Sequence, residues 1–103
     1  MRKVTLYVPV DTEAQDIASG GLEDALLREY GGYTRYGAAR GEWRDATTGR
    51  VYSETALVYV VLCADESAAV AALLQYGRDA GEKAVAYDVA EVKAVIVAVG
   101  SAA

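Results

Sequence analysis

The sequence contains no histidine and only one cysteine, and these two scarcities exclude several kinds of chemistry. Histidine is the side chain that titrates near neutral pH without help from its surroundings, so serine–histidine and cysteine–histidine catalysis are excluded. A single cysteine cannot form an intrachain disulfide, and without histidine the usual zinc and haem ligand sets cannot be assembled within one chain. Because Cys63 falls within an apolar run, we interpret it as a buried structural thiol. Because no intrachain disulfide is possible, we expect a reducing, cytoplasmic location.

Long apolar runs and nucleotide or metal motifs are also missing. The longest apolar runs, residues 56–64 and 94–99, are far shorter than the roughly 20 residues that span a bilayer. There is no calcium-binding loop and no P-loop, so we predict no metal and no cofactor. The chain carries 10 basic and 15 acidic residues, a net charge of −5. This balance argues against general binding to nucleic acids or anionic membranes.

What is present is the composition of one globular domain, residues 1–103, with 53% hydrophobic and 24% charged residues. Alternating polarity predicts a strand over residues 2–10, and Asp11 or Thr12 is expected to cap a short turn after it. A helix over residues 22–30 follows the glycine pair at 20–21, and Gly31 ends it.

The second half of the chain predicts more strands than helices. We expect two short strand pieces within residues 33–45 around a glycine-containing bulge, then a turn over residues 46–49 in which Gly49 adopts a positive φ. A strand is expected over residues 50–63, and its stretch 56–63 is apolar on both faces, which indicates a central position covered on both sides. Asp65 is expected to cap a helix over residues 66–79, and residues 83–99 form one long strand or two successive ones.

The predicted order is therefore β-α-β-β-α-β, the ferredoxin-like α+β sandwich: a four-stranded antiparallel sheet with both helices on one face. Two helices cover only one face of the sheet, so the other face would expose side chains such as Val58, Val60 and Leu62. A homodimer or larger homo-oligomer packed through this open face is our interpretation. A monomer and a complex with a different partner protein stay open as alternatives.

One segment carries residues suited to a binding site. Residues 28–54 hold five of the seven arginines against four acidic residues, so this stretch is positive within an acidic protein. Arginine forks bind phosphate or carboxylate, aromatic rings stack on bases, and glycines let backbone amides approach an anion. The candidate ligand-binding residues are Tyr33, Thr34, Arg35, Tyr36, Arg40, Trp43, Arg44, Arg50, Tyr52 and Glu54.

A simpler interpretation explains the same residues without a ligand. Arginine and tyrosine alternating along an edge strand form a solvated face with cation–π pairs. Trp43 would then anchor the sheet, and Glu54 would be an ion-pair partner of Arg44 or Arg50 across the hairpin. The sequence leaves both interpretations open.

The runs Gly-Gly-Tyr-Thr at 31–34, Gly-Glu-Trp at 41–43 and Gly-Arg-Val-Tyr-Ser-Glu at 49–54 resemble a pattern in small, mostly uncharacterised bacterial and phage proteins. The resemblance covers residues 31–97 and implies a ferredoxin-like domain without an established activity. By analogy, small phage proteins that resemble this one in size and acidity include oligomeric sponges that sequester nucleotide immune signals between subunits.

Our leading hypothesis is a non-catalytic homo-oligomeric module that binds a small anionic, nucleotide-type ligand, with such a sponge as one form of it. The alternative is a protein–protein interaction module acting on a host or partner protein, because Tyr, Trp and Arg are also enriched at interaction hot spots. A small enzyme that uses Glu54 as an acid or base ranks third, because no second titratable group is evident to pair with it.

Overall fold

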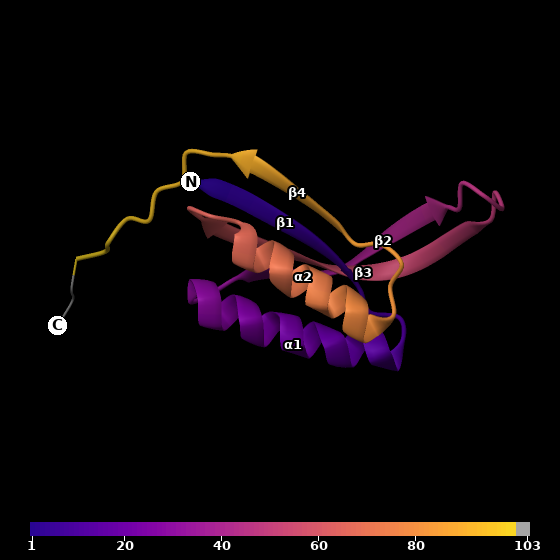
Figure 1. Ribbon diagram of the computed structural model, residues 1–103. Coiled ribbons are helices and arrows are strands. Elements are labelled where there is room, and N and C mark those ends of the chain that lie inside the picture. Colours follow the sequence, from indigo (N-terminus) through magenta and orange to yellow (C-terminus); the bar gives the residue numbers. More distant parts are fainter. Residues whose placement is uncertain (101–103) are drawn as a thin grey trace.

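The computed structural model describes residues 1–100, which form one antiparallel sheet with two helices on the same face (Figure 1). The elements, in chain order, are β1 (Arg2–Pro9), α1 (Glu13–Tyr30), β2 (Thr34–Arg44), β3 (Val51–Cys63), α2 (Ser67–Ala80) and β4 (Ala86–Glu91). The strands are arranged in the order β2-β3-β1-β4. This is the ferredoxin-like topology, so the predicted fold class is confirmed.

The core lies between the two helices and the central strands β1 and β3. Strand alternation places every second side chain of β1 toward the helices, where Val4 is opposite Val61 and Leu6 is opposite Tyr59. The helices contribute leucines and Tyr76 to the same cluster, and the buried members are Val4, Leu6, Val8, Leu22, Leu26, Tyr59, Val61, Leu73 and Tyr76. This periodicity explains why the apolar positions of β1 were readable from sequence.

Helix α1 begins at Glu13, so the prediction that it starts at residue 22 is wrong. Thr12 forms a capping box with Gln15: the Thr12 hydroxyl accepts the Gln15 amide at 3.1 Å, and the Gln15 side chain accepts the Thr12 amide at 2.9 Å. The glycine pair at 20–21 costs helix stability, about 1 kcal/mol for each glycine relative to alanine. Burial of Ala18 and Leu22 on either side offsets that cost, so the helix continues through the pair.

Strand β2 is a single strand and not two pieces, although the predicted bulge is present. Its register against β3 shifts between Tyr36 and Ala39, where two residues of β2, 37 and 38, stand against one residue of β3, 57. Such an extra residue reverses which face the following side chains point to. The turn that joins β2 to β3 has Gly49 at φ 73°, as the sequence predicted.

Strand β4 ends at Glu91, although the apolar pattern predicted strand as far as residue 99. The reason is the length of its neighbour: Glu91 pairs with Arg2 at the start of β1, and the Val92 amide then donates to the Met1 carbonyl. No residue of β1 remains to pair with residues 93–100. These residues lead away from the sheet (Figure 1).

Helix α2 begins at Ser67, with Glu66 in the capping position where Asp65 was expected. The Asp65 carboxylate nevertheless accepts the Ser67 amide at 2.9 Å and the Ser67 hydroxyl at 2.7 Å. It therefore satisfies a free amide of the first turn from one residue further back.

Within residues 1–100, the second face of the sheet carries no helix (Figure 1). Val58 and Val60 are half-buried and Leu62 is exposed on this side of β3, which agrees with the expected open face. Among residues 1–100, no helix is long and apolar enough to cross a membrane. In the same described part of the chain, no three acidic or cysteine side chains lie together as a metal-binding group would require.

Candidate functional site

The β2–β3 hairpin projects beyond the ends of the helices and forms one wall of the candidate site (Figure 1). The Asp45 carboxylate closes its turn by accepting the amides of Thr47 at 2.8 Å and Thr48 at 3.0 Å. These two hydrogen bonds favour the charged form and hold the pKa of Asp45 below its usual range. The turn is thus ordered by its own side chain, and the register of the hairpin follows from it.

Trp43 and Glu54 meet on the open face of this hairpin. The Trp43 indole Nε1 donates to the Glu54 carboxylate at 2.5 Å. Gly41 lies directly opposite Glu54, and a Cβ added at Gly41 would stand 3.1 Å from the indole nitrogen. The missing side chain of Gly41 therefore provides the space through which Trp43 reaches Glu54. The Trp43 ring is 52% exposed, so its surface remains open to a ligand.

Glu54 is held in an environment that favours its neutral form. Burial is the main cause and raises the pKa of Glu54, whereas the hydrogen bond from Trp43 opposes the rise. Repulsion from Glu82 and Asp11 adds to the increase. A carboxyl with a raised pKa beside an aromatic ring in a pocket is a recurring feature of functional sites.

A pocket of about 540 Å³ opens between this hairpin and the segment that joins α2 to β4. Its volume is within the range of small-molecule sites, about 300–1,000 Å³. It contains three aromatic rings, three carboxylates and two basic side chains, and its lining residues are Tyr7, Pro9, Trp43, Arg44, Asp45, Tyr52, Glu54, Gly81, Glu82, Lys83, Ala84, Val85 and Ala86. We call this the hairpin pocket.

Four of the ten sequence-predicted site residues line the hairpin pocket: Trp43, Arg44, Tyr52 and Glu54. Tyr52 lies opposite Trp43 in the register of the hairpin, so the two rings share the face that carries Glu54. Arg50 lies over the Tyr52 ring, with 4.9 Å from its guanidinium carbon to the ring centre. Arg50 therefore lies next to the pocket and packs against Tyr52, one of its lining residues.

The remaining predicted residues lie elsewhere on the sheet. Arg40 pairs with Glu42 at 3.2 Å and donates to Ser53. Thr34 and Tyr36 lie before the bulge, opposite Val60 and Val58 of β3. These three residues are exposed and contribute nothing to the pocket lining.

Tyr33 and Arg35 belong to a structural cluster on the helix-covered face. The Glu23 carboxylate of α1 accepts from Arg35 at 2.8 Å and from the Tyr59 hydroxyl at 2.6 Å. Tyr33 packs edge-on against Tyr59, with the ring centres 5.5 Å apart. Burial raises the pKa of Glu23, but the hydrogen bonds from Tyr59 and Arg35 outweigh it and the net shift is downward. The ion pair of Arg35 with Glu23 therefore links β2 to α1.

Sequence reasoning missed the half of the pocket that comes from outside the hairpin. Tyr7 of β1 and the segment with Glu82 and Lys83 are brought in by the fold. The Tyr7 hydroxyl donates to Asp88 at 2.6 Å, and this bond raises the pKa of Tyr7. The only sequence signal was the outward-facing position of Tyr7 in its alternating strand.

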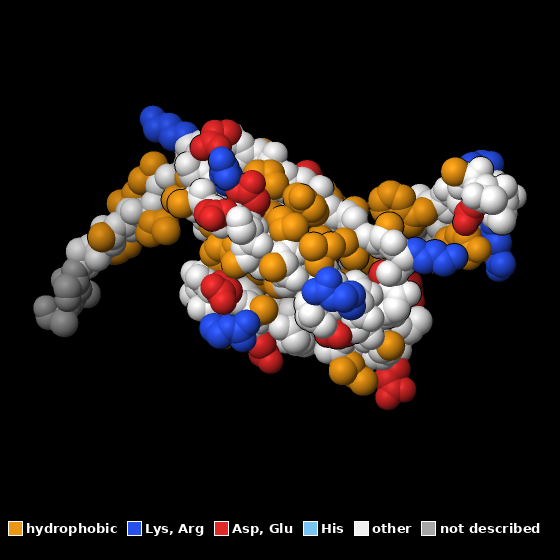
Figure 2. Space-filling view, in the orientation of Figure 1, with side chains coloured by type: hydrophobic (Ala, Val, Ile, Leu, Met, Phe, Trp, Pro, Cys, Tyr) orange, Lys and Arg blue, Asp and Glu red, His pale blue; other side chains and the backbone are white. Residues whose placement is uncertain are grey.

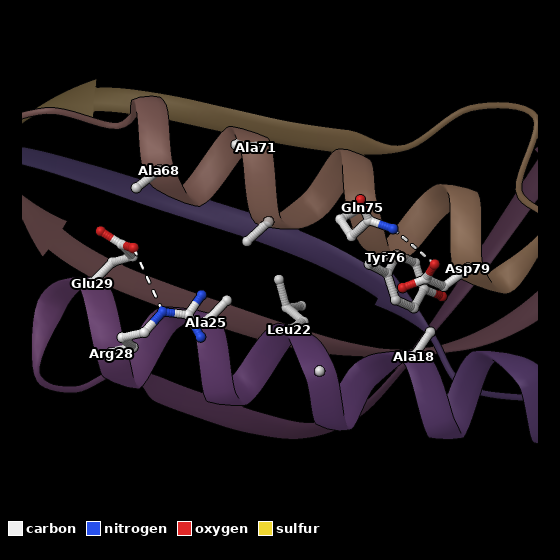
Figure 3. A pocket seen from close by; sticks show the side chains of 12 residues that line it. Ala18, Leu22, Ala25, Arg28, Glu29, Ala68, Ala71, Gln75, Tyr76 and Asp79 are labelled. Atoms are coloured by element: carbon white, nitrogen blue, oxygen red, sulfur yellow. Dashed lines mark hydrogen bonds and ion pairs between the residues drawn. The ribbon is translucent and has the colours of Figure 1, made fainter.

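A second hollow of about 390 Å³ runs between α1 and α2 (Figure 3). Small side chains such as Ala18, Ala25 and Ala71 line its length. At one end Arg28 pairs with Glu29 at 3.7 Å, and at the other Gln75 donates to Asp79 at 2.8 Å (Figure 3). Because its polar groups are paired with one another and it has no exposed ring surface comparable to that of Trp43, it is a weaker candidate than the hairpin pocket.

The comparisons with known proteins give a likeness of fold. No family model and no curated protein matches the chain. Among solved structures, a phage SAM lyase in complex with S-methyl-5'-thioadenosine superposes with a TM-score of 0.63 at 16% sequence identity, covering 87% of this chain and 80% of that one. The two proteins share a fold. That neighbour is a phage protein bound to a small nucleoside-type ligand.

Proposed function

We propose that the protein binds a small nucleoside-type ligand in the hairpin pocket. The observation that carries the proposal is the pairing of an exposed Trp43 ring with the Glu54 carboxylate, 2.5 Å apart, inside a pocket large enough for a nucleoside. Trp43 and Tyr52 offer the stacking surfaces for a base. The fold shared with a protein that holds S-methyl-5'-thioadenosine supports this ligand class.

The charges of the pocket favour a nucleoside that carries a positive sulfur over one that carries several phosphates. Asp45, Glu54 and Glu82 outnumber the two basic side chains of the lining. A carboxylate beside aromatic rings attracts a cation through both its charge and the ring faces. S-adenosylmethionine (SAM), the compound after which the neighbouring lyase is named, has such a sulfonium centre.

The sequence predicted an anionic ligand from the arginine-rich segment, but the proposed ligand needs only one anionic group. Arg35 and Arg40 are held by Glu23 and Glu42, so they are not positioned to neutralise a ligand. Arg44 and Lys83 line the hairpin pocket, and these two cations suit a single carboxylate such as that of an amino-acid moiety. A ligand with both a sulfonium and a carboxylate satisfies both sets of charges.

The same site supports two uses, and we propose sequestration by a homo-oligomer as the first, as a phage sponge would do. Turnover is the second candidate, and the raised pKa of Glu54 favours it because a carboxylate that binds its proton more tightly is a stronger base than an ordinary one. In this use the Glu54 carboxylate would take a proton from the carbon next to the one bonded to sulfur, and the C–H electron pair would form a carbon–carbon double bond. The carbon–sulfur bond of SAM breaks with its electron pair on sulfur, which gives S-methyl-5'-thioadenosine (MTA) and an unsaturated amino acid. The two uses differ in whether the ligand leaves intact.

Native mass spectrometry of protein purified gently from cells tests the proposal, followed by incubation with SAM and chromatography of the products. An added mass that denaturation releases as an adenosine-type compound supports ligand binding. Recovery of unchanged SAM supports sequestration, and appearance of MTA supports turnover. Absence of any retained mass, together with no binding of SAM or MTA by calorimetry, would overturn the proposal in favour of a protein–protein interaction module.

A further inference from the structure

The segment after β4, residues 92–100, is apolar and stands clear of the body of the protein (Figure 1). Residues 94–99 read Ala-Val-Ile-Val-Ala-Val, and the exposed fractions of Val95, Ile96, Val97 and Val99 lie between 70% and 91%. β-Branched residues favour extended strands. A strand that is apolar on both faces is normally buried on both. The side chains of this segment are instead exposed, so a packing partner is missing.

The outer edge of β4 lacks a neighbouring strand. β4 pairs with β1 on one side only and is the last strand of the sheet, so its outer backbone amides and carbonyls have no strand partner among residues 1–100. On the helix side of β4, Tyr87 is 46% and Val89 39% exposed, and Leu74 of α2 is 46% exposed. Figure 2 shows hydrophobic side chains gathered over α2 and toward β4.

The α2 residues that line the hollow between the helices are 68, 71, 72, 75, 76 and 79. Leu74 is therefore on the side turned away from α1, toward β4. Gly77 is on that side too, since a Cβ there would meet Val85, just before β4, at 2.9 Å. Tyr87 and Val89 thus expose apolar surface beside an unpaired strand edge, and Leu74 adds an exposed apolar side chain on α2.

We infer that residues 94–99 of one copy of this chain add as a strand to the free β4 edge of a second copy. The six residues of the segment match the six of β4, Ala86–Glu91, so the new ladder would satisfy the whole edge. One face of the added strand would cover Tyr87 and Val89. Edge strands left bare in this way invite pairing with another chain.

A second copy fits this edge better than a partner of different chemistry, because the segment and the edge are present in every copy in equal number. Two copies can each add residues 94–99 to the β4 edge of the other, or each copy can add them to the next copy around a closed ring. This inference specifies the contact between subunits of the homo-oligomer in the proposed function, and it rests on that homo-oligomer. It is independent of which ligand the hairpin pocket takes.

The test compares the mass in solution of the full chain with that of Ile96→Asp, by light scattering after size-exclusion chromatography. A charge at the centre of the added strand is expected to convert the oligomer to monomer. Ile17→Asp is the matched control, because Ile17 is an isoleucine of α1 that is 68% exposed and lies outside the proposed interface. It should leave the mass unchanged.

A second measurement locates the contact. Two variants that each carry one added cysteine, Val89→Cys and Val97→Cys, are mixed and oxidised, and a cross-linked pair of twice the chain mass is expected in the mixture. Cys63 is buried and is present in both variants, so unsubstituted protein is the background control.

A full chain that is monomeric at all concentrations would overturn both this inference and the proposed oligomer. An oligomer that survives Ile96→Asp would overturn this inference alone. Calorimetry with MTA on Ile96→Asp reports separately on the pocket, since its lining residues lie elsewhere.

Discussion

Replacing Glu54 by glutamine separates the chemistry of the hairpin pocket from the stability of the fold. The substitution keeps an oxygen that can accept from the Trp43 indole, 2.5 Å from the present carboxylate, and removes only the charge. Burial raises the pKa of Glu54, so the folded protein binds a proton at this carboxyl more tightly than the unfolded chain does. Its charge therefore opposes folding above the ordinary pKa of 4.5. We expect Glu54→Gln to unfold at the same temperature as the parent at neutral pH, or at a higher one.

Loss of the charge should instead appear in ligand affinity. A hydrogen-bonded or close charge pair contributes about 1.5–3 kcal/mol, and the half-exposed position of Glu54 reduces this to about 1–2 kcal/mol by solvent screening. That range corresponds to about a 5- to 30-fold weaker Kd. The loss should affect a ligand with a positive centre at sulfur and spare MTA, which is neutral there.

Isothermal calorimetry measures the difference, using MTA and a SAM analogue in which a protonated amine replaces the sulfonium, because this analogue cannot be cleaved at sulfur. Glu42→Gln is the matched control: Glu42 is on the same hairpin, but it is exposed and pairs with Arg40. The reasoning is refuted if the two variants bind the cationic analogue equally well. It is also refuted if Glu54→Gln weakens the binding of both ligands by the same factor.

Three further substitutions test other parts of the structure. Gly41→Ala places a Cβ 3.1 Å from the Trp43 indole nitrogen, so we expect a shifted tryptophan emission maximum and weaker ligand binding, measured by fluorescence. Tyr76→Phe leaves the buried Pro9 carbonyl without its donor and should lower the free energy of unfolding by about 1–3 kcal/mol in urea titrations. Glu23 has a lowered pKa, so its charge stabilises the fold above pH 4.5 and this contribution is lost as the pH falls further. Glu23→Gln should therefore flatten the acid limb of a stability-against-pH profile.

The topology could be predicted from sequence because it depends on local signals that agree with one another. Alternation in β1, the doubly apolar β3 and the glycines that follow both helices each point to one arrangement. The errors occurred where tertiary contacts override local signals. Helix α1 runs through a glycine pair because its flanks are buried, and β4 stops where β1 offers no further partner. Neither fact can be read from the residues concerned.

The candidate site was only half predictable, for a related reason. Composition drew attention to the hairpin, and Trp43, Tyr52 and Glu54 do line the pocket. The same composition could not tell which arginines were already bound, since the partners of Arg35 and Arg40 depend on which face each points to. Pocket residues from β1 and from the segment after α2 come together only in the folded chain.

The bulge between Tyr36 and Ala39 explains how one strand serves both the fold and the pocket. Before it, Arg35 is opposite Tyr59 and faces the helices; after it, Trp43 is opposite Tyr52 and faces the open side of the sheet. Both are odd-numbered residues of β2, so regular alternation would have put them on one face. The extra residue reverses the second half of the strand. The part of β2 before the bulge therefore places Arg35 against Glu23 of α1, and the part after it places Trp43 in the lining of the hairpin pocket.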